Sequence, residues 1–244
     1  MAVIEVKNFA KSYNGKPVHK DVSFSVEKGE CVGLVGGSGI GKSVVLRSLI
    51  GLEKADSGEI WIDGEEISKW KERELIAIRK KVAYVFQNGA LFDSMSVYNN
   101  LAYPLREHTD LNEKQIEKRI HEQLEEFGLR EAVGKLPAEL SGGMQKRVGL
   151  ARAMVIGPKV ILYDEPTAGL DPYNTLKIRE TVLRLKSKGV TSVFVTHDMP
   201  TAIAVCDRFF LLAGGKVADV RRVEDLRHTN EGPLEKFIQG EVGS

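Results

Sequence analysis

The sequence is poor in cysteine and almost balanced in charge. Its 244 residues include only two cysteines, Cys31 and Cys206, and its 35 Lys and Arg residues against 34 Asp and Glu residues give a formal net charge of +1. Two cysteines far apart in apolar stretches suit buried, reduced thiols better than a disulfide framework. The balanced charge provides no overall field that would attract nucleic acid or an acidic membrane. Any charged partner must therefore be recognised locally.

Long hydrophobic runs, internal repeats and low-complexity tracts are also absent. No stretch approaches the roughly 18 uncharged apolar residues needed to span a bilayer, and the N-terminus lacks the basic and apolar segments of a signal peptide. We therefore expect a cytoplasmic chain that reaches a membrane only through a partner. A length of 244 residues suits one large domain, or a core with a smaller subdomain.

Short apolar runs that end at glycine or acidic residues predict buried strands. Cys31–Val35 leads into a glycine cluster and then into a helix that we expect over Ser43 to Ile50. Further strands of this kind are predicted at Val82–Phe86, Val160–Tyr163 and Ser192–Val195. Continuous apolar runs are typical of parallel strands that are buried on both faces. Residues 3–6 and 22–26 alternate between apolar and polar side chains instead, which predicts half-buried strands near the N-terminus.

The pattern changes to helices between residues 88 and 156. One helical face is marked by apolar residues at spacings of four, four and three, namely Ile116, Ile120, Leu124 and Phe127. Strand patterns return only after this stretch. We therefore predict an α/β core made of residues 1–87 and 157–221, an inserted helical subdomain over 88–156 and a short C-terminal tail over 222–244, together forming one domain.

A glycine-rich motif joins the first buried strand to the helix that follows it. Gly36 to Ser43, GGSGIGKS, matches G-x-x-x-x-G-K-[ST] in the strand-to-helix context that this motif requires. Glycines let successive backbone N–H groups and the helix N-terminus face phosphate groups. Lys42 is then expected to contact the β- and γ-phosphates, and Ser43 a magnesium ion. The predicted nucleotide-binding residues are Gly36, Gly37, Ser38, Gly39, Ile40, Gly41, Lys42, Ser43 and Val44.

Two carboxylates stand at the end of the strand predicted over residues 160–163. Asp164 and Glu165 lie where an α/β sheet presents its ligand site, at the carboxyl ends of its strands. Asp164 is expected to complete the magnesium shell. Glu165, one residue farther toward the γ-phosphate, is the better candidate to orient and activate an attacking water.

A second anion-binding element is predicted at LSGGMQ, residues 140–145. Ser141 is suited to cap a helix, and Gly142 and Gly143 leave the first amides of that helix open. This hexapeptide resembles the signature of the ABC ATPase family, with Met144 where glutamine is commoner, and matching elements run along nearly the whole chain. The resemblance implies an α/β fold with a P-loop NTPase (RecA-like) core, an N-terminal antiparallel β subdomain and an inserted α-helical subdomain. It also implies hydrolysis of ATP with Mg²⁺.

The same resemblance implies roles for residues outside these motifs. Tyr13 is similar to the aromatic residue that stacks on adenine, and Gln87 to the loop glutamine that reaches the magnesium ion and the attacking water. His197 is similar to the switch histidine that reaches the γ-phosphate, and residues 168–171 resemble the loop that touches the opposite subunit. The remaining histidines fall on no motif position and are expected to be structural, namely His19, His108, His121 and His228.

The family arrangement implies that the chain works as a pair. The signature of one subunit, here Ser141, Gly142, Gly143 and Met144, covers the nucleotide that the other subunit holds in its P-loop. One P-loop and one signature in each chain therefore predict a dimer that encloses two ATP molecules. Family members that power transport act through an integral membrane permease, which would place this chain on the cytoplasmic side of the inner membrane.

Residues 88–108, NGALFDSMSVYNNLAYPLREH, carry a narrower resemblance. They are similar to ATPases of the bacterial Mla phospholipid-trafficking system, which implies phospholipid cargo and two further partners, an MCE-domain lipid-binding protein and a STAS-domain protein. The alternatives are the ATPase of another ABC importer, a non-transport ABC ATPase, or a P-loop phosphotransferase. Repair ATPases carry a long insert and translation factors two cassettes, which this sequence lacks, and a phosphotransferase would not need the signature. No nucleic-acid partner is expected.

Overall fold

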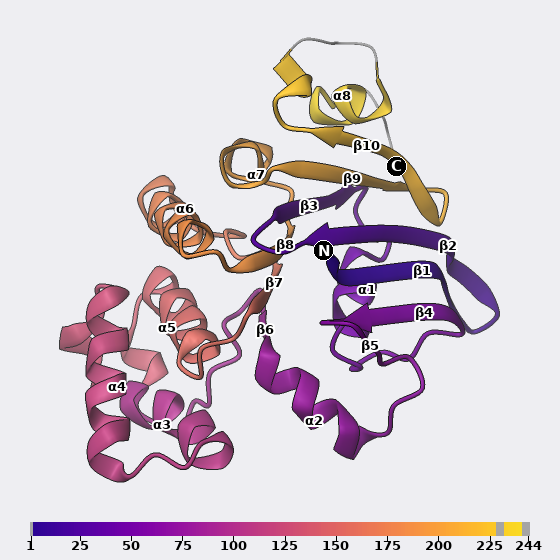
Figure 1. Cartoon of the computed structure of the whole chain (residues 1–244). Helices are drawn as coiled ribbons and strands as arrows, with labels where there is room; N and C mark the ends of the chain where they lie inside the picture. The colour runs from indigo at the N-terminus through magenta and orange to yellow at the C-terminus, as the bar shows by residue number, and fades with distance from the viewer. Residues whose placement is uncertain (1, 228–231, 241–244) are drawn as a thin grey trace.

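The computed structural model describes residues 2–227 and 232–240, which are built around one mixed sheet (Figure 1). Within these residues ten strands follow the order β5-β4-β1-β2-β10-β9-β3-β8-β7-β6. The strands are β1 Ala2–Tyr13, β2 Lys16–Glu27, β3 Cys31–Gly36, β4 Ser57–Ile62, β5 Glu65–Glu66, β6 Val82–Val85, β7 Val160–Asp164, β8 Thr191–Val195, β9 Arg208–Ala213 and β10 Lys216–Arg222.

The parallel part of the sheet consists of β9, β3, β8, β7 and β6. Neighbouring strands within this set pair in parallel, for example β7 with β8 from Val160↔Thr191 to Asp164↔Val195. Every residue of β3 and β8 is buried, which explains their continuous apolar sequences. The predicted parallel strands are confirmed, and their carboxyl ends meet at one edge of the sheet.

The N-terminal strands form the antiparallel part. β1 pairs with β2 and with β4, and β4 pairs with the short β5. Buried and more exposed residues alternate along much of β2 and β4, as expected for strands with one covered face. A parallel bridge between Lys216 of β10 and Asp21 of β2 joins this part to the rest of the sheet. The predicted α/β fold with antiparallel N-terminal strands is therefore confirmed.

Helices cover both faces of the sheet and extend beyond β6 at its edge. They are α1 Lys42–Ser48, α2 Glu72–Lys81, α3 Val97–His108, α4 Glu113–Glu126, α5 Gly142–Met154, α6 Pro172–Ser187, α7 Met199–Val205 and α8 Pro233–Ile238, with short 3-10 turns at Arg130–Ala132, Pro137–Glu139 and Asp225–Arg227. The buried side chains of α1 and α2 pack with those of β1 and β2, whereas those of α3 to α7 belong to a second cluster. In Figure 1, α3, α4 and α5 gather beyond β6.

Some elements differ from the sequence predictions. Helix α2 and the hairpin β9–β10 were not predicted, and α1 ends at Ser48 rather than Ile50 because residues 49–51 form a turn that closes on Gly51. His228 and part of the predicted tail, residues 228–231 and 241–244, lie outside the described residues. The division at residues 88 and 156 stays a prediction.

The two cysteines and the lengths of the helices bear on two further expectations. Cys31 and Cys206 are buried, free thiols, as predicted, and the structure brings their sulfur atoms to 3.9 Å from each other. Over residues 2–227 and 232–240, no helix is both long and apolar enough to cross a bilayer.

Candidate functional site

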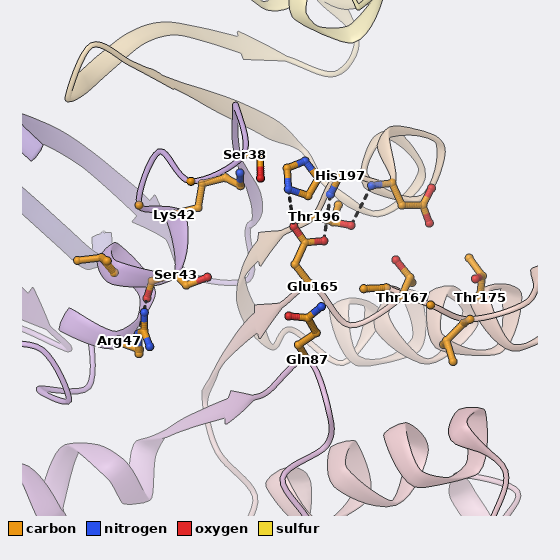
Figure 2. A pocket seen from close by; sticks show the side chains of 17 residues that line it. Ser38, Lys42, Ser43, Arg47, Gln87, Glu165, Thr167, Thr175, Thr196 and His197 are labelled. Atoms are coloured by element: carbon orange, nitrogen blue, oxygen red, sulfur yellow. Dashed lines mark hydrogen bonds and ion pairs between the residues drawn. The ribbon is translucent and has the colours of Figure 1, made fainter. Parts of the chain in front are cut away.

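A pocket of about 770 Å³ opens at the edge where the parallel strands end (Figure 2). Its walls come from the glycine-rich loop after β3, helix α1, and the segments that follow β6, β7 and β8. The lining residues are Ser38, Gly39, Gly41, Lys42, Ser43, Val44, Arg47, Gln87, Glu165, Thr167, Ala168, Gly169, Leu170, Thr175, Thr196, His197 and Asp198. Segments far apart in the sequence thus meet at one site.

The glycine-rich loop folds around the side chain of Lys42. The Lys42 ammonium donates hydrogen bonds to the carbonyl oxygens of Gly36 at 2.8 Å and Gly37 at 3.0 Å, and the residue is only 6 % exposed. Burial lowers the pKa of Lys42, and the carboxylates of Glu165 and Asp164 oppose that shift. The glycine-rich loop therefore surrounds the Lys42 ammonium at the N-terminus of α1.

Ser43 joins the glycine loop to the end of β7. Its hydroxyl donates to Asp164 Oδ1 at 2.7 Å, and the Tyr84 hydroxyl donates to Asp164 Oδ2 at 2.6 Å. Burial raises the pKa of Tyr84, and its hydrogen bond to Asp164 raises it further, so the phenol stays neutral and keeps donating. The hydroxyl of Ser43 and the carboxylate of Asp164 form a small cluster of oxygen atoms, the ligand type that hard cations such as Mg²⁺ prefer.

Glu165 is held in an unusual backbone conformation beside His197. Its φ of 51° lies in the left-handed region, which costs free energy for a residue with a side chain. The Glu165 N–H donates to the Val195 carbonyl at 2.9 Å, which secures the turn after β7. The His197 N–H donates to Glu165 Oε2 at 3.1 Å, and His197 Nε2 lies 3.2 Å from Oε1. Both side chains face the pocket in Figure 2.

Gln87 enters the pocket from the loop after β6 (Figure 2). The loop turns sharply at Gly89 and Ala90, whose φ values are 71° and 48°. Arg152 of α5 donates to the Gly89 carbonyl at 3.2 Å. A Cβ atom on Gly149 of α5 would lie 2.7 Å from the Gly89 backbone, so α5 and the loop are in direct backbone contact. Helix α5 therefore fixes the position from which Gln87 reaches the pocket.

Lys146 makes a further connection between α5 and the pocket wall. Its ammonium donates a hydrogen bond to the carbonyl of Ala168, a lining residue in the loop after Glu165. Burial lowers the pKa of Lys146, and the carboxylate of Glu165 opposes that shift. The cation therefore secures the segment that carries Glu165.

The signature residues lie at the start of α5 and outside the lining of this pocket. Ser141 caps the helix by accepting a hydrogen bond from the Met144 N–H at 3.3 Å. Ser141 and Gly142 are exposed, whereas a Cβ atom on Gly143 would lie 2.3 Å from the side chain of Asn174 in α6. The chain does not bring Ser141, Gly142, Gly143 or Met144 to its own glycine-rich loop.

The structure separates the predicted site residues into three groups. Lys42, Ser43, Gln87, Glu165 and His197 line one pocket with most of the glycine-rich loop, and Asp164 is bonded directly to Ser43. Tyr13, at the end of β1, is 40 % exposed with the Lys11 ammonium 5.2 Å from its ring centroid, but it does not line this pocket. The signature residues form the third group, at the N-terminus of α5.

The sequence did not predict several residues that line the pocket or that form hydrogen bonds with its residues. They are Arg47, Tyr84, Lys146, Thr167, Thr175, Thr196 and Asp198. Arg47 donates to the Ser43 carbonyl at 3.2 Å, and Thr196 accepts from the Asp198 N–H at 3.0 Å. Thr196 and Asp198 flank His197, so a wider reading of that segment could have found them. The contacts of Tyr84 and Lys146 depend on tertiary packing and have no local sequence signal.

Comparison with known proteins gives consistent matches. Residues 19–168 match the family model described as ABC transporter. The chain is 41 % identical over 228 residues to the methionine import ATP-binding protein MetN of Carboxydothermus hydrogenoformans, covering 92 % of this chain and 67 % of that protein. It is 36 % identical over 240 residues to the intermembrane phospholipid transport system ATP-binding protein MlaF of Haemophilus influenzae, covering 98 % of this chain and 91 % of that protein.

Two further matches bear on the fold and on the range of relatives. A probable ribonucleotide transport ATP-binding protein, mkl of Mycobacterium leprae, is 40 % identical over 238 residues, covering 97 % of this chain and 69 % of that protein. A solved dimeric ATP-binding cassette, in a post-hydrolysis state with ADP and Pi, superposes with a TM-score of 0.84 at 32 % identity. That match covers 90 % of this chain and 98 % of the other.

Proposed function

The chain belongs to the ABC transporter family and is an ATP-hydrolysing subunit of such a transporter, and we propose that its ATPase activity powers the movement of phospholipids between the inner and outer membranes of a bacterium. The observation that carries the cargo assignment is the resemblance of residues 88–108 to Mla ATPases. The similarity to MlaF over nearly the whole of both chains supports it. The methionine importer subunit is equally similar, so amino-acid import is the second candidate.

We propose that the pocket holds ATP with its phosphates against the glycine-rich loop. The amides of residues 36–44 and the Lys42 ammonium would bind the phosphates, and Ser43, Asp164 and Gln87 would hold Mg²⁺. The contact between Ser43 Oγ and Asp164 Oδ1, 2.7 Å long, supports this because it brings two suitable oxygen donors together. When bound, the metal ion neutralises charge that develops on the phosphates.

In the proposed reaction, Glu165 orients a water molecule in line with the γ-phosphate and accepts its proton. His197 keeps the Glu165 carboxylate in place through its backbone N–H and its ring. Lys42 stabilises the charge that develops on the phosphoryl oxygens. Gln87 reaches the same space from the loop after β6 and, through the contacts of that loop with α5, would link the site to the helices outside the sheet.

The position of the signature, in which Ser141 and Gly142 are exposed, suggests how the site is completed. Ser141, Gly142, Gly143 and Met144 do not line the pocket of their own chain, and we propose that they cover the ATP of a second copy. Tyr13 would stack on the adenine, which requires the base to extend beyond the described pocket toward the end of β1. ATP would therefore favour a closed dimer, and hydrolysis an open one.

An apolar groove beside Gln87 is the proposed docking surface for the permease. It has a volume of about 470 Å³ and lies between β6, α3 and α5. Phe86, Phe92 and Tyr103 are each between 38 % and 45 % exposed there, and the rings of Phe92 and Tyr103 meet edge to face at 5.4 Å. Large exposed aromatic side chains around a groove are typical of protein interaction sites. The chain would then sit on the cytoplasmic side of the inner membrane, with an MCE-domain protein and a STAS-domain protein as further partners.

Reconstitution tests the cargo assignment. The chain would be purified with its permease, inserted into vesicles of phosphatidylethanolamine and phosphatidylglycerol, and compared with detergent micelles that contain no phospholipid. We expect phospholipid to stimulate ATP hydrolysis and free methionine to have no effect. Equal activity in vesicles and in phospholipid-free detergent would contradict phospholipid transport, and stimulation by methionine would favour the second candidate.

A further inference from the structure

Strand β2 carries a buried histidine directly beneath the glycine-rich loop. His19 is 1 % exposed, and its ring packs on Phe9 with the ring centroids 5.6 Å apart. Its Nε2 atom lies 3.0 Å from the carbonyl oxygen of Gly41, the residue that precedes α1. His19 matches no motif, and the sequence alone predicts only a structural role for it.

The chemistry of this contact defines the state of the ring. A carbonyl oxygen can only accept a hydrogen bond, so Nε2 must carry a proton and donate it. Burial lowers the pKa of His19, which favours the neutral ring with its single proton on Nε2. The Nδ1 atom is then an acceptor, and it has no hydrogen-bond partner among the described residues.

The unpartnered Nδ1 atom counts against a role for His19 in filling space alone. A buried nitrogen without a partner is unfavourable, whereas an apolar side chain of similar size would pack on Phe9 without that cost. What the imidazole adds over such a side chain is the Nε2–H donor. That donor points at one peptide group of the glycine-rich loop.

The Gly41 carbonyl is fixed by three donors. It accepts hydrogen bonds from the N–H groups of Val44 at 2.9 Å and Val45 at 3.2 Å, and from His19 at 3.0 Å. In a planar trans peptide the C=O and the next N–H point in opposite directions. Holding the Gly41 carbonyl therefore aims the N–H of Lys42 away from the protein interior, at the start of α1 where the pocket opens.

The close approach of His19 also explains why residue 41 is glycine. Gly41 has a φ of 95°, in the left-handed region. A Cβ atom at this position would lie 2.5 Å from His19 Nε2 and 2.6 Å from the Val18 side chain. The strand that carries His19 and the glycine-rich loop therefore fit each other closely.

We propose that His19 is a positioning residue of the nucleotide site, whose Nε2–H donor fixes the Gly41 peptide so that the amide of Lys42 faces the phosphates. The inference rests on the proposed placement of the ATP phosphates against residues 36–44. His19 itself touches no nucleotide. It acts through the peptide that it holds.

The test replaces the donor while keeping the volume of the side chain. His19→Phe removes the hydrogen bond, and His19→Gln retains an amide N–H near the position of Nε2. Binding of the non-hydrolysable analogue AMP-PNP with Mg²⁺ would be measured by calorimetry on the full chain. We expect His19→Phe to weaken binding about three- to tenfold, the effect of one hydrogen bond, and His19→Gln to stay within about twofold of the wild type.

A packing variant distinguishes positioning from general stability. Phe9→Leu loosens the contact with the His19 ring but leaves its donor, so it should lower the melting temperature and leave the dissociation constant for AMP-PNP unchanged. Should His19→Phe fail to fold, His19→Met provides the apolar comparison. Equal losses of affinity in His19→Gln and the apolar variant, or in Phe9→Leu, would overturn the proposal. Failure of the wild type to bind AMP-PNP would instead contradict the phosphate site itself.

Discussion

His197 holds Glu165 at two points, with its N–H 3.1 Å from Oε2 and its Nε2 atom 3.2 Å from Oε1. The two residues follow neighbouring parallel strands, β7 and β8, whose ends are paired at Asp164↔Val195. The left-handed backbone at Glu165 directs its carboxylate toward the pocket, where these contacts secure it. Strain at Glu165 therefore coincides with the position of the proposed general base.

Glu165→Gln should retain ATP binding but lower the rate of hydrolysis by at least about 100-fold, because general bases contribute factors of this size. The amide has nearly the shape of the carboxylate but cannot accept the proton of the water. Steady-state phosphate release and equilibrium ATP binding measure the two effects. Glu180→Gln, at an exposed position on α6, is the matched control. Normal hydrolysis by Glu165→Gln would remove Glu165 from the role of base.

Lys42→Ala should weaken ATP binding by about tenfold or more, since each charged hydrogen bond contributes about 1.5–3 kcal/mol, and should abolish hydrolysis because no cation then stabilises the charge on the phosphoryl oxygens. Lys42 is the buried cation of the glycine-rich loop, and its hydrogen bonds to the carbonyl groups of Gly36 and Gly37 hold its ammonium at the N-terminus of α1. Calorimetric titration with ATP and Mg²⁺ provides the dissociation constant. Lys20→Ala, which removes an exposed lysine from β2, should leave the dissociation constant for ATP unchanged. Unchanged affinity in Lys42→Ala would undo the assignment of the phosphate site.

Lys146→Ala should lower the rate of hydrolysis more than it lowers ATP affinity. The variant releases the Ala168 carbonyl, and with it the loop after Glu165, but removes no group from the glycine-rich loop. We expect a loss of about tenfold or less in kcat, consistent with one charge-assisted hydrogen bond. Lys146→Arg retains a cation and should recover part of the rate. A proportional loss of ATP affinity would show that Lys146 supports the fold of the whole site instead.

Gly149→Ala should disturb the Gln87 loop because the added methyl group would lie 2.7 Å from the Gly89 backbone. Helix α5 or the loop must shift to make room for the methyl group. This steric cost opposes the gain in helix propensity that alanine brings over glycine. We expect a lower melting temperature and a lower rate of hydrolysis. Gly142→Ala is the control for stability on the same helix, because nothing lies within 4 Å of its added Cβ atom, and it should leave the melting temperature unchanged. A Gly149→Ala variant as stable and active as the wild type would show that this contact is not restrictive.

Much of the fold could be predicted because its central strands are continuous apolar runs. The strands β3, β6, β7 and β8 were each found from such a run. Helix α2 was missed because its buried face is carried by only Leu75 and Ile78 among charged residues. Strand β9 was also missed, although its residues 209–212 form a continuous apolar run, whereas β10 gives no such signal because it alternates exposed and half-buried residues, with charged side chains on both faces.

The candidate site could be predicted where its chemistry is local in the sequence. The glycine-rich loop and the carboxylates after β7 follow motifs that fix backbone and side chain together. Tyr84 and His19 could not be found in this way, because their partners Asp164 and Gly41 are 80 and 22 residues away. Sequence reasoning also placed Tyr13 at the nucleotide, whereas in the single chain it lies outside the pocket lining.

Ser141→Arg should block hydrolysis while leaving ATP binding by the single chain intact, because Ser141 is exposed at the start of α5 and outside the pocket of its own chain. Ser141→Thr retains the capping hydroxyl and is the matched control. Parallel loss of binding and hydrolysis in Ser141→Arg would indicate that the signature acts within its own chain.

Mixing two inactive variants provides the sharper test of this arrangement. Ser141→Arg keeps an intact glycine-rich loop, and Lys42→Ala keeps an intact signature. If each site is built from two chains, a mixed dimer contains one complete site and one that lacks both elements. Hydrolysis should therefore reappear when the two purified variants are combined, although each alone is inactive. A mixture as inactive as its components would show that the two motifs must come from one chain, because no mixed dimer then has a complete site.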